Sequence, residues 1–163
     1  MYHCLVQFYL VGRRRSAFDP IRAIEPLGRF THLFMDSGEP DAALAAKADV
    51  ILADLREMDA RRVLEVLTQS KGERTELIVL AEQGQTSQLT EYYSELWDVW
   101  FVPCTQEELC FRFSRWQQNY KLSRDYWQTS QFLETTINSV PNLVWYKTKD
   151  GIHEKVNDSF CAT

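Results

Sequence analysis

Residues 49–55 read Asp-Val-Ile-Leu-Ala-Asp-Leu, an apolar run bounded by two acidic residues. A nearly continuous apolar run is typical of a strand that helices cover on both faces, because a half-exposed strand alternates apolar and polar residues. We therefore expect a buried parallel strand over Val50–Asp54. Asp54 then lies at the carboxyl end of this strand, where the ligands of open α/β sheets bind.

Four further β-rich runs accompany this strand, and helical patterns separate all five. The other strands are expected at Cys4–Val11, Phe30–Met35, Leu77–Ala81 and Val99–Val102. Regular alternation of strands and helices predicts an α/β fold with right-handed crossovers. The fold class is therefore a five-stranded parallel sheet, doubly wound in the flavodoxin-like manner, with a long helix at its carboxyl end.

The helical segments between the strands carry recognisable start and stop signals. The first is expected to be capped at Asp19-Pro20 and to run, with Ile21, Ile24 and Leu27 on one face, to Gly28. The others are expected over Pro40–Ala48, over Arg61–Ser70, and after Thr86 or Ser87 with Leu89, Tyr93 and Leu96 on one side.

From residue 105 to 140 the chain has neither glycine nor proline, which predicts one helix on the order of 50 Å long. Leu109 and Phe113 are expected to pack on the sheet of their own domain. Beyond them, apolar residues continue at a spacing close to 3.5, which indicates a parallel coiled coil between two copies of the chain. The residues expected in this homodimer helix are Trp116, Tyr120, Trp127, Leu133 and Ile137.

Composition limits the classes of partner. A net charge of −5 over 163 residues disfavours a broad nucleic-acid surface. The first apolar stretch is too short to span a bilayer, and its basic residues follow it, so no membrane partner is expected. The four cysteines have no metal-ligand or redox spacing, which favours a cytoplasmic location and no metal or other cofactor.

Two stretches together resemble response-regulator receiver domains. Residues 49–55 resemble the family's third strand, and residues 98–103 followed by 106–109 resemble its fifth strand, lysine-proline step and last helix. The resemblance covers about residues 4–120 and implies that Asp54 is the candidate phosphoacceptor. It also implies an acidic pair after the first strand that holds Mg²⁺, a hydroxyl residue ending the fourth strand and a lysine ending the fifth.

Most of these partners are missing. Gly12 and Arg13 stand in the loop where the acidic pair belongs, Ala81 replaces the hydroxyl residue and Val102 replaces the lysine, whereas Pro103 is kept. Three successive arginines would repel a divalent cation, and neither alanine nor valine can hydrogen-bond a phosphoryl oxygen. The chain is therefore expected to be a degenerate receiver with no metal site.

The arginine run at residues 13–15 has three interpretations. One of these arginines pairs with Asp54 and holds the site in one state, or the loop and Asp54 are solvated. Binding of an anion or nucleotide is the weaker interpretation, because no glycine-rich phosphate loop accompanies the run.

Residues 139–160 resemble the opening of a PAS sensor domain, with a first strand, an Asp150-Gly151 hairpin turn and a second strand. The expected organisation is a receiver-like domain over 1–104 whose last helix continues to about 120, a signalling helix over 105–140, and a truncated PAS start over 141–163. The resemblance implies a longer protein with a downstream PAS domain and an effector such as a histidine kinase or diguanylate cyclase.

These observations predict the non-enzymatic input module of a bacterial signalling protein, acting through protein contacts and dimerisation. The alternative is a working phosphoacceptor in a two-component phosphorelay, modified on Asp54 with Mg²⁺ held by replacement ligands such as Asp36 or Glu57. A third possibility, a small-molecule enzyme or flavin binder on the same topology, is disfavoured because no histidine accompanies a nucleophile at a strand end.

Overall fold

All five expected strands are present, and they form one parallel sheet in a computed structural model that describes residues 4–138, 145–147 and 153–156. The sheet order is β2-β1-β3-β4-β5, the flavodoxin-like order, which confirms the predicted fold class. The strands are β1 (Cys4–Val11), β2 (Phe30–Ser37), β3 (Val50–Asp54), β4 (Glu76–Glu82) and β5 (Asp98–Val102).

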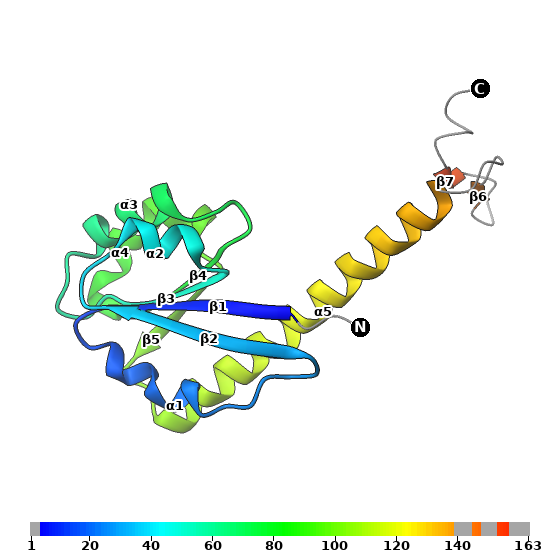
Figure 1. Cartoon of the computed structure of the whole chain (residues 1–163). Coiled ribbons are helices and arrows are strands. Elements are labelled where there is room, and N and C mark those ends of the chain that lie inside the picture. The colour runs from blue at the N-terminus through cyan, green and yellow to red at the C-terminus, as the bar shows by residue number, and fades with distance from the viewer. Residues whose placement is uncertain (1–3, 139–144, 148–152, 157–163) are drawn as a thin grey trace. The chain divides into compact units, whose positions relative to one another are not determined.

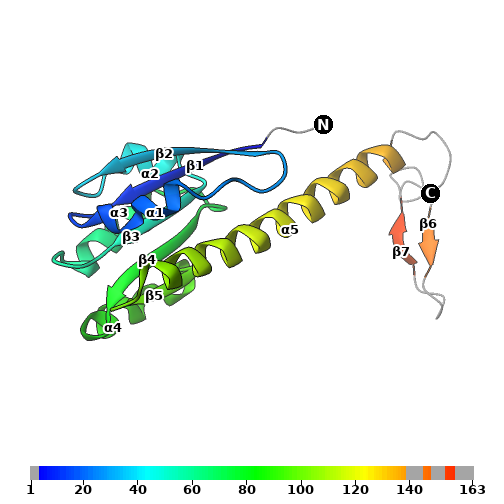
Figure 2. The same ribbon diagram turned by 90° about the horizontal axis from the view of Figure 1, so that it is seen from below.

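Helices cover both faces of this sheet (Figure 1). One face carries α1 (Asp19–Arg22), which follows the 3-10 turn η1 (Arg15–Phe18), and the first part of α5 (Gln106–Asn138). The other face carries α2 (Ala42–Lys47), α3 (Ala60–Ser70) and α4 (Thr86–Leu89), as the second view also shows (Figure 2). Two more 3-10 turns, η2 (Gln83–Gln85) and η3 (Thr90–Glu95), flank α4. Every residue of β3 is buried between the two helical layers, as its apolar sequence predicts.

The helix expected to end at Gly28 is much shorter than predicted. It begins as η1, so Asp19 lies inside the helical segment and does not cap it, and α1 ends at Arg22. Pro26 disfavours a helical Glu25, so the helix could not have continued as far as Gly28. Only Ile21 of the predicted apolar face is fully buried.

The helix expected after Thr86 also departs from a regular α-helix. After the four residues of α4 the chain tightens into η3, which has three residues per turn. The change of period turns Tyr93 outward, where it is 52% exposed, and brings Tyr92 against the core in its place.

The chain divides into two compact units, Met1–Gln117 and Gln118–Thr163. The second unit contains the rest of α5 and an antiparallel pair of strands, β6 (Trp145–Lys147) and β7 (His153–Val156). The Asp150-Gly151 turn and the remainder of the PAS-like segment lie outside the described residues, so the PAS start stays a prediction. Among the residues described, no helix combines the length and apolar character needed to cross a bilayer.

Candidate functional site

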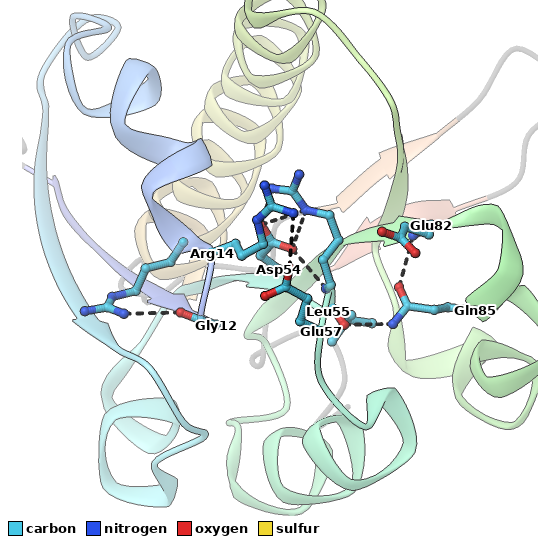
Figure 3. Close-up of polar contacts among 9 residues, drawn as sticks. Gly12, Arg14, Asp54, Leu55, Glu57, Glu82 and Gln85 are labelled. Atoms are coloured by element: carbon cyan, nitrogen blue, oxygen red, sulfur yellow. Dashed lines mark hydrogen bonds and ion pairs between the residues drawn. The ribbon is translucent and has the colours of Figure 1, made fainter.

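Asp54, the candidate phosphoacceptor, ends β3 at the carboxyl edge of the sheet and its side chain is fully buried. The neighbouring strands place Gly12 on one side of it and the end of β4 on the other (Figure 3). The expected site residues of the first four strands therefore do gather at one edge, as the parallel topology requires.

Arg56 donates hydrogen bonds to both oxygens of the Asp54 carboxylate. Its Nε lies 3.0 Å from Oδ1, its Nη2 lies 2.6 Å from Oδ2, and its backbone N–H donates to Oδ1 over 3.1 Å. The Arg56 side chain is itself only 16% exposed. The hydrogen bond to Asp54 raises the pKa of Arg56, although burial acts in the opposite direction. This is a two-pronged, charge-assisted pair within one loop.

The hypothesis that Arg13, Arg14 or Arg15 pairs with Asp54 is wrong. Each has another carboxylate within reach: Arg13 Nε lies 3.0 Å from Glu39, Arg14 Nη1 lies 3.4 Å from Glu57, and Arg15 Nε lies 3.8 Å from Asp36. The side chain of Arg15 also donates to the carbonyl of Gly12. Local acidic residues at the ends of neighbouring loops therefore take up all three arginines.

Gly12 is a position where the backbone excludes a side chain. Its φ is +137°, and a Cβ built there would lie 2.5 Å from the backbone carbonyl oxygen of Asp54. A carboxylate at this position would require the two loops to separate. The ends of β1 and β3 are in close contact, and this contact leaves no room for an acidic side chain at position 12.

At the expected positions, the ends of β4 and β5 carry no side chain that could hydrogen-bond a phosphoryl oxygen. Ala81 is fully buried and pairs with Phe101, while Val102 is half-buried and joined to Pro103 by a cis peptide bond. Gln85 supplies the polar contacts here instead: its amide donates to the carbonyl of Leu55 over 2.7 Å, and its oxygen accepts from the N–H of Glu82. These contacts connect the loops after β3 and β4.

Sequence reasoning missed both Arg56 and Gln85. For Arg56 a signal was available, since an aspartate commonly accepts a hydrogen bond from the backbone N–H two residues later, and the residue at that position is a cation. For Gln85 no such pattern exists, because its partners belong to two separate loops.

The acidic side chains at this edge do not fit a magnesium site. Asp36 receives a hydrogen bond of 2.7 Å from Arg22, Glu57 pairs with Arg14, and Asp54 is bonded to Arg56. In the described part of the chain, no three histidine, cysteine, aspartate or glutamate side chains are grouped as a metal would need.

The residues expected in the dimer helix fall into two groups. Trp116, Tyr120 and Ile137 are buried, and the Trp116 indole N–H donates to Glu76 over 2.6 Å. Trp127 and Leu133 are 41% and 38% exposed. Leu109 and Phe113 are buried, as expected for residues that pack on their own domain. Of these expected residues, Trp127 and Leu133 therefore keep the largest exposed fractions.

Comparison with known proteins gives structural neighbours only. No protein-family model matches the chain, and no curated protein matches its sequence. NtrX from Brucella abortus in complex with ADP aligns at a TM-score of 0.55 and 14% identity, over 82% of this chain and 34% of that one. Adenylate cyclase from Rhodopirellula baltica aligns at 0.52 and 11%, over 77% and 96%. A response regulator receiver domain protein from Clostridium thermocellum aligns at 0.48 and 10%, over 72% and 98%.

At these identities the likeness concerns the fold alone. The five-stranded parallel sheet, its flanking helices and the long α5 make the fold receiver-like, and it is the fold that the sequence predicted. The chain aligns with only about a third of the NtrX chain, so the activity of that protein says nothing direct about this one.

Proposed function

We propose that this chain is the regulatory input module of a bacterial signalling protein, whose receiver-like domain acts through protein contacts and dimerisation without phosphorylation. The observation that carries the proposal is the state of Asp54: its carboxylate is fully buried and both oxygens are hydrogen-bonded to Arg56.

Phosphoryl transfer to a carboxylate needs a free oxygen lone pair in line with the phosphorus, and cations that neutralise the charge on the transferred group. At Asp54 the attacking oxygens are engaged, and the metal-holding carboxylates are replaced by Gly12 and Arg13. Freeing the carboxylate would leave two opposite charges buried without partners, which costs several kcal/mol. The pair therefore favours a single, permanent state of the site.

The attachment of α5 supports a role in contacts. Two hydrogen bonds attach its first turns to the domain. The Trp116 indole N–H donates to Glu76, and the Gln117 amide donates to the carbonyl of Glu25 over 2.8 Å. A structural change at the sheet would therefore shift the helix that leads to the second unit. We propose that the downstream partners are a PAS domain and an effector of the same cytoplasmic protein.

Incubation with Mg²⁺ and acetyl phosphate, followed by intact-mass spectrometry, tests this function. The wild-type chain should gain no phosphoryl group. Arg56→Ala, which frees the carboxylate, serves as the matched variant, and modification of this variant alone would identify the ion pair as the block. Stoichiometric phosphorylation of wild-type Asp54 would overturn the proposal and establish the phosphoacceptor alternative.

A further inference from the structure

The part of α5 in the second unit carries an exposed apolar stripe. Of the residues expected in the dimer helix, this stripe includes Leu133 alone. Leu122, Tyr126 and Leu133 follow one another at spacings of four and seven, which places them on one face of the helix. They are 71%, 76% and 38% exposed. Large apolar side chains that recur on one exposed face mark an interaction surface.

From this spacing we infer that α5 residues 119–136 form a parallel, in-register, two-stranded coiled coil with a second copy of this chain. With Tyr126 and Leu133 at the first core position of the heptad, a, Leu122 falls at the other core position, d. Asn119 then occupies the preceding a position. A single asparagine at a is the residue that selects two parallel strands in register, because it pairs with its own counterpart. This feature favours a second copy over an unrelated helix.

The charges of this segment are arranged so that two copies can meet. Between residues 118 and 138 only four residues are charged, two of each sign. None falls at a, d or the flanking position e, and the one at the flanking position g, Asp125, pairs with Lys121 of its own helix over 2.5 Å. Arg124 lies over the ring of Tyr120, away from the stripe. A second copy therefore meets no unpaired charge of like sign across the seam.

This seam differs from the one expected around Trp127. Successive residues are about 100° apart around a helix, so Trp127 points well away from the direction of Tyr126. Phe132, which is 70% exposed, lies beside the seam and extends its apolar surface. The inference rests on the proposed function in treating the second unit as a contact element, but it depends on none of the chemistry at Asp54.

Sedimentation equilibrium of the 163-residue chain tests the inference. The wild type should be a dimer, and Tyr126→Glu or Leu122→Glu should raise the dissociation constant by at least about tenfold. Gln131→Glu adds the same charge at an exposed position outside the seam, and Trp127→Glu replaces the neighbouring aromatic residue. Both should change the constant by less than about threefold. Circular dichroism of each variant checks that α5 remains helical.

Asn119→Ile gives a second, independent measurement, since removing the polar a residue should yield species larger than dimers. A monomeric wild type would overturn the inference, as would a dimer that Trp127→Glu weakens as much as Tyr126→Glu does. A monomeric wild type would also count against the dimerisation in the proposed function, whereas a dimer that Trp127→Glu weakens equally would overturn this inference alone. The phosphorylation assay tests the chemistry at Asp54 separately from both results.

Discussion

The carboxyl edge of the sheet and the aromatic face beneath α5 lie in the same unit but are stabilised by opposite chemistry. At the edge, five arginines each lie within ion-pair distance of a carboxylate, and of these pairs Asp54–Arg56 is the buried one. Beneath α5, aromatic rings pack against one another: the ring of Phe8 lies 5.0 Å from that of Phe34, 5.7 Å from Phe113 and 5.4 Å from Trp116, between ring centroids.

The two regions therefore contribute different amounts to the free energy of unfolding. An exposed ion pair contributes between zero and about 1 kcal/mol, whereas a buried aromatic ring contributes several times more. At the edge, only the buried Asp54–Arg56 pair should matter much to the free energy of unfolding. Substitutions of the exposed residues at the edge should therefore cost little stability, while the aromatic face that holds α5 could not be altered as freely.

The largest expected effect belongs to Phe113 of the aromatic face. Phe113→Ala removes a fully buried ring that packs against Phe8 and Trp116, and should lower the free energy of unfolding by about 3–5 kcal/mol. Urea denaturation followed by Trp fluorescence and circular dichroism measures the loss. Phe111→Ala, on the same helix but 66% exposed, is the control and should cost less than about 1 kcal/mol. Equal losses in the two variants would contradict the assignment of stability to this face.

At the carboxyl edge, Arg56→Met should have a somewhat smaller effect. It leaves the buried Asp54 carboxylate without its ionic partner, which should cost about 3 kcal/mol at pH 7. Asp54→Asn combined with Arg56→Met removes the uncompensated charge as well, so the double variant should recover more than half of that loss. The same denaturation experiment measures both losses, and Asp54→Asn alone completes the cycle that gives the coupling energy of the pair. If the single and double variants were equally unstable, the carboxylate would not depend on Arg56.

The sequence predicted the sheet better than the pairs at its edge, for a physical reason. Strand positions follow from local apolar runs such as residues 49–55, and the right-handed crossovers decide on which face of the sheet each helix lies. The partner of Asp54 depends on side-chain directions in three loops. The arginines at 13–15 follow the strand next to that of Asp54, yet Glu39, Glu57 and Asp36 lie within ion-pair distance of them.

The two helices that departed from prediction show the same limit. The effect of Pro26 on α1 could have been foreseen, because a proline there disfavours a helix through Glu25. The tightening of the chain into η3 could not, since no residue there forces three residues per turn, and the packing of Tyr92 on the core accompanies it. Local sequence signals therefore show that a helical segment is present more reliably than they show its bounds or its regularity.

The smallest expected effect concerns His32, the polar member of the aromatic face. Its ring lies 4.9 Å from that of Phe8, and its buried Nδ1 has no hydrogen-bond partner in the described part of the chain. Burial lowers the pKa of His32, so the unfolded chain takes up the proton first as the pH falls. The stabilising contribution of the neutral ring is therefore complete above the unfolded pKa of about 6.5 and is lost as the pH falls below it, by no more than about 1.4 kcal/mol per pH unit.

His32→Phe should remove this dependence, because phenylalanine fills a similar space and cannot take up a proton. Unfolding free energies of both proteins between pH 7.5 and 5, measured in urea, give the difference between the two profiles, in which the carboxylates common to both cancel. The wild type should lose stability relative to the variant over that range. Parallel profiles would show that His32 can be protonated within the aromatic face at no cost, and that this face is less tightly closed beneath α5 than its ring contacts indicate.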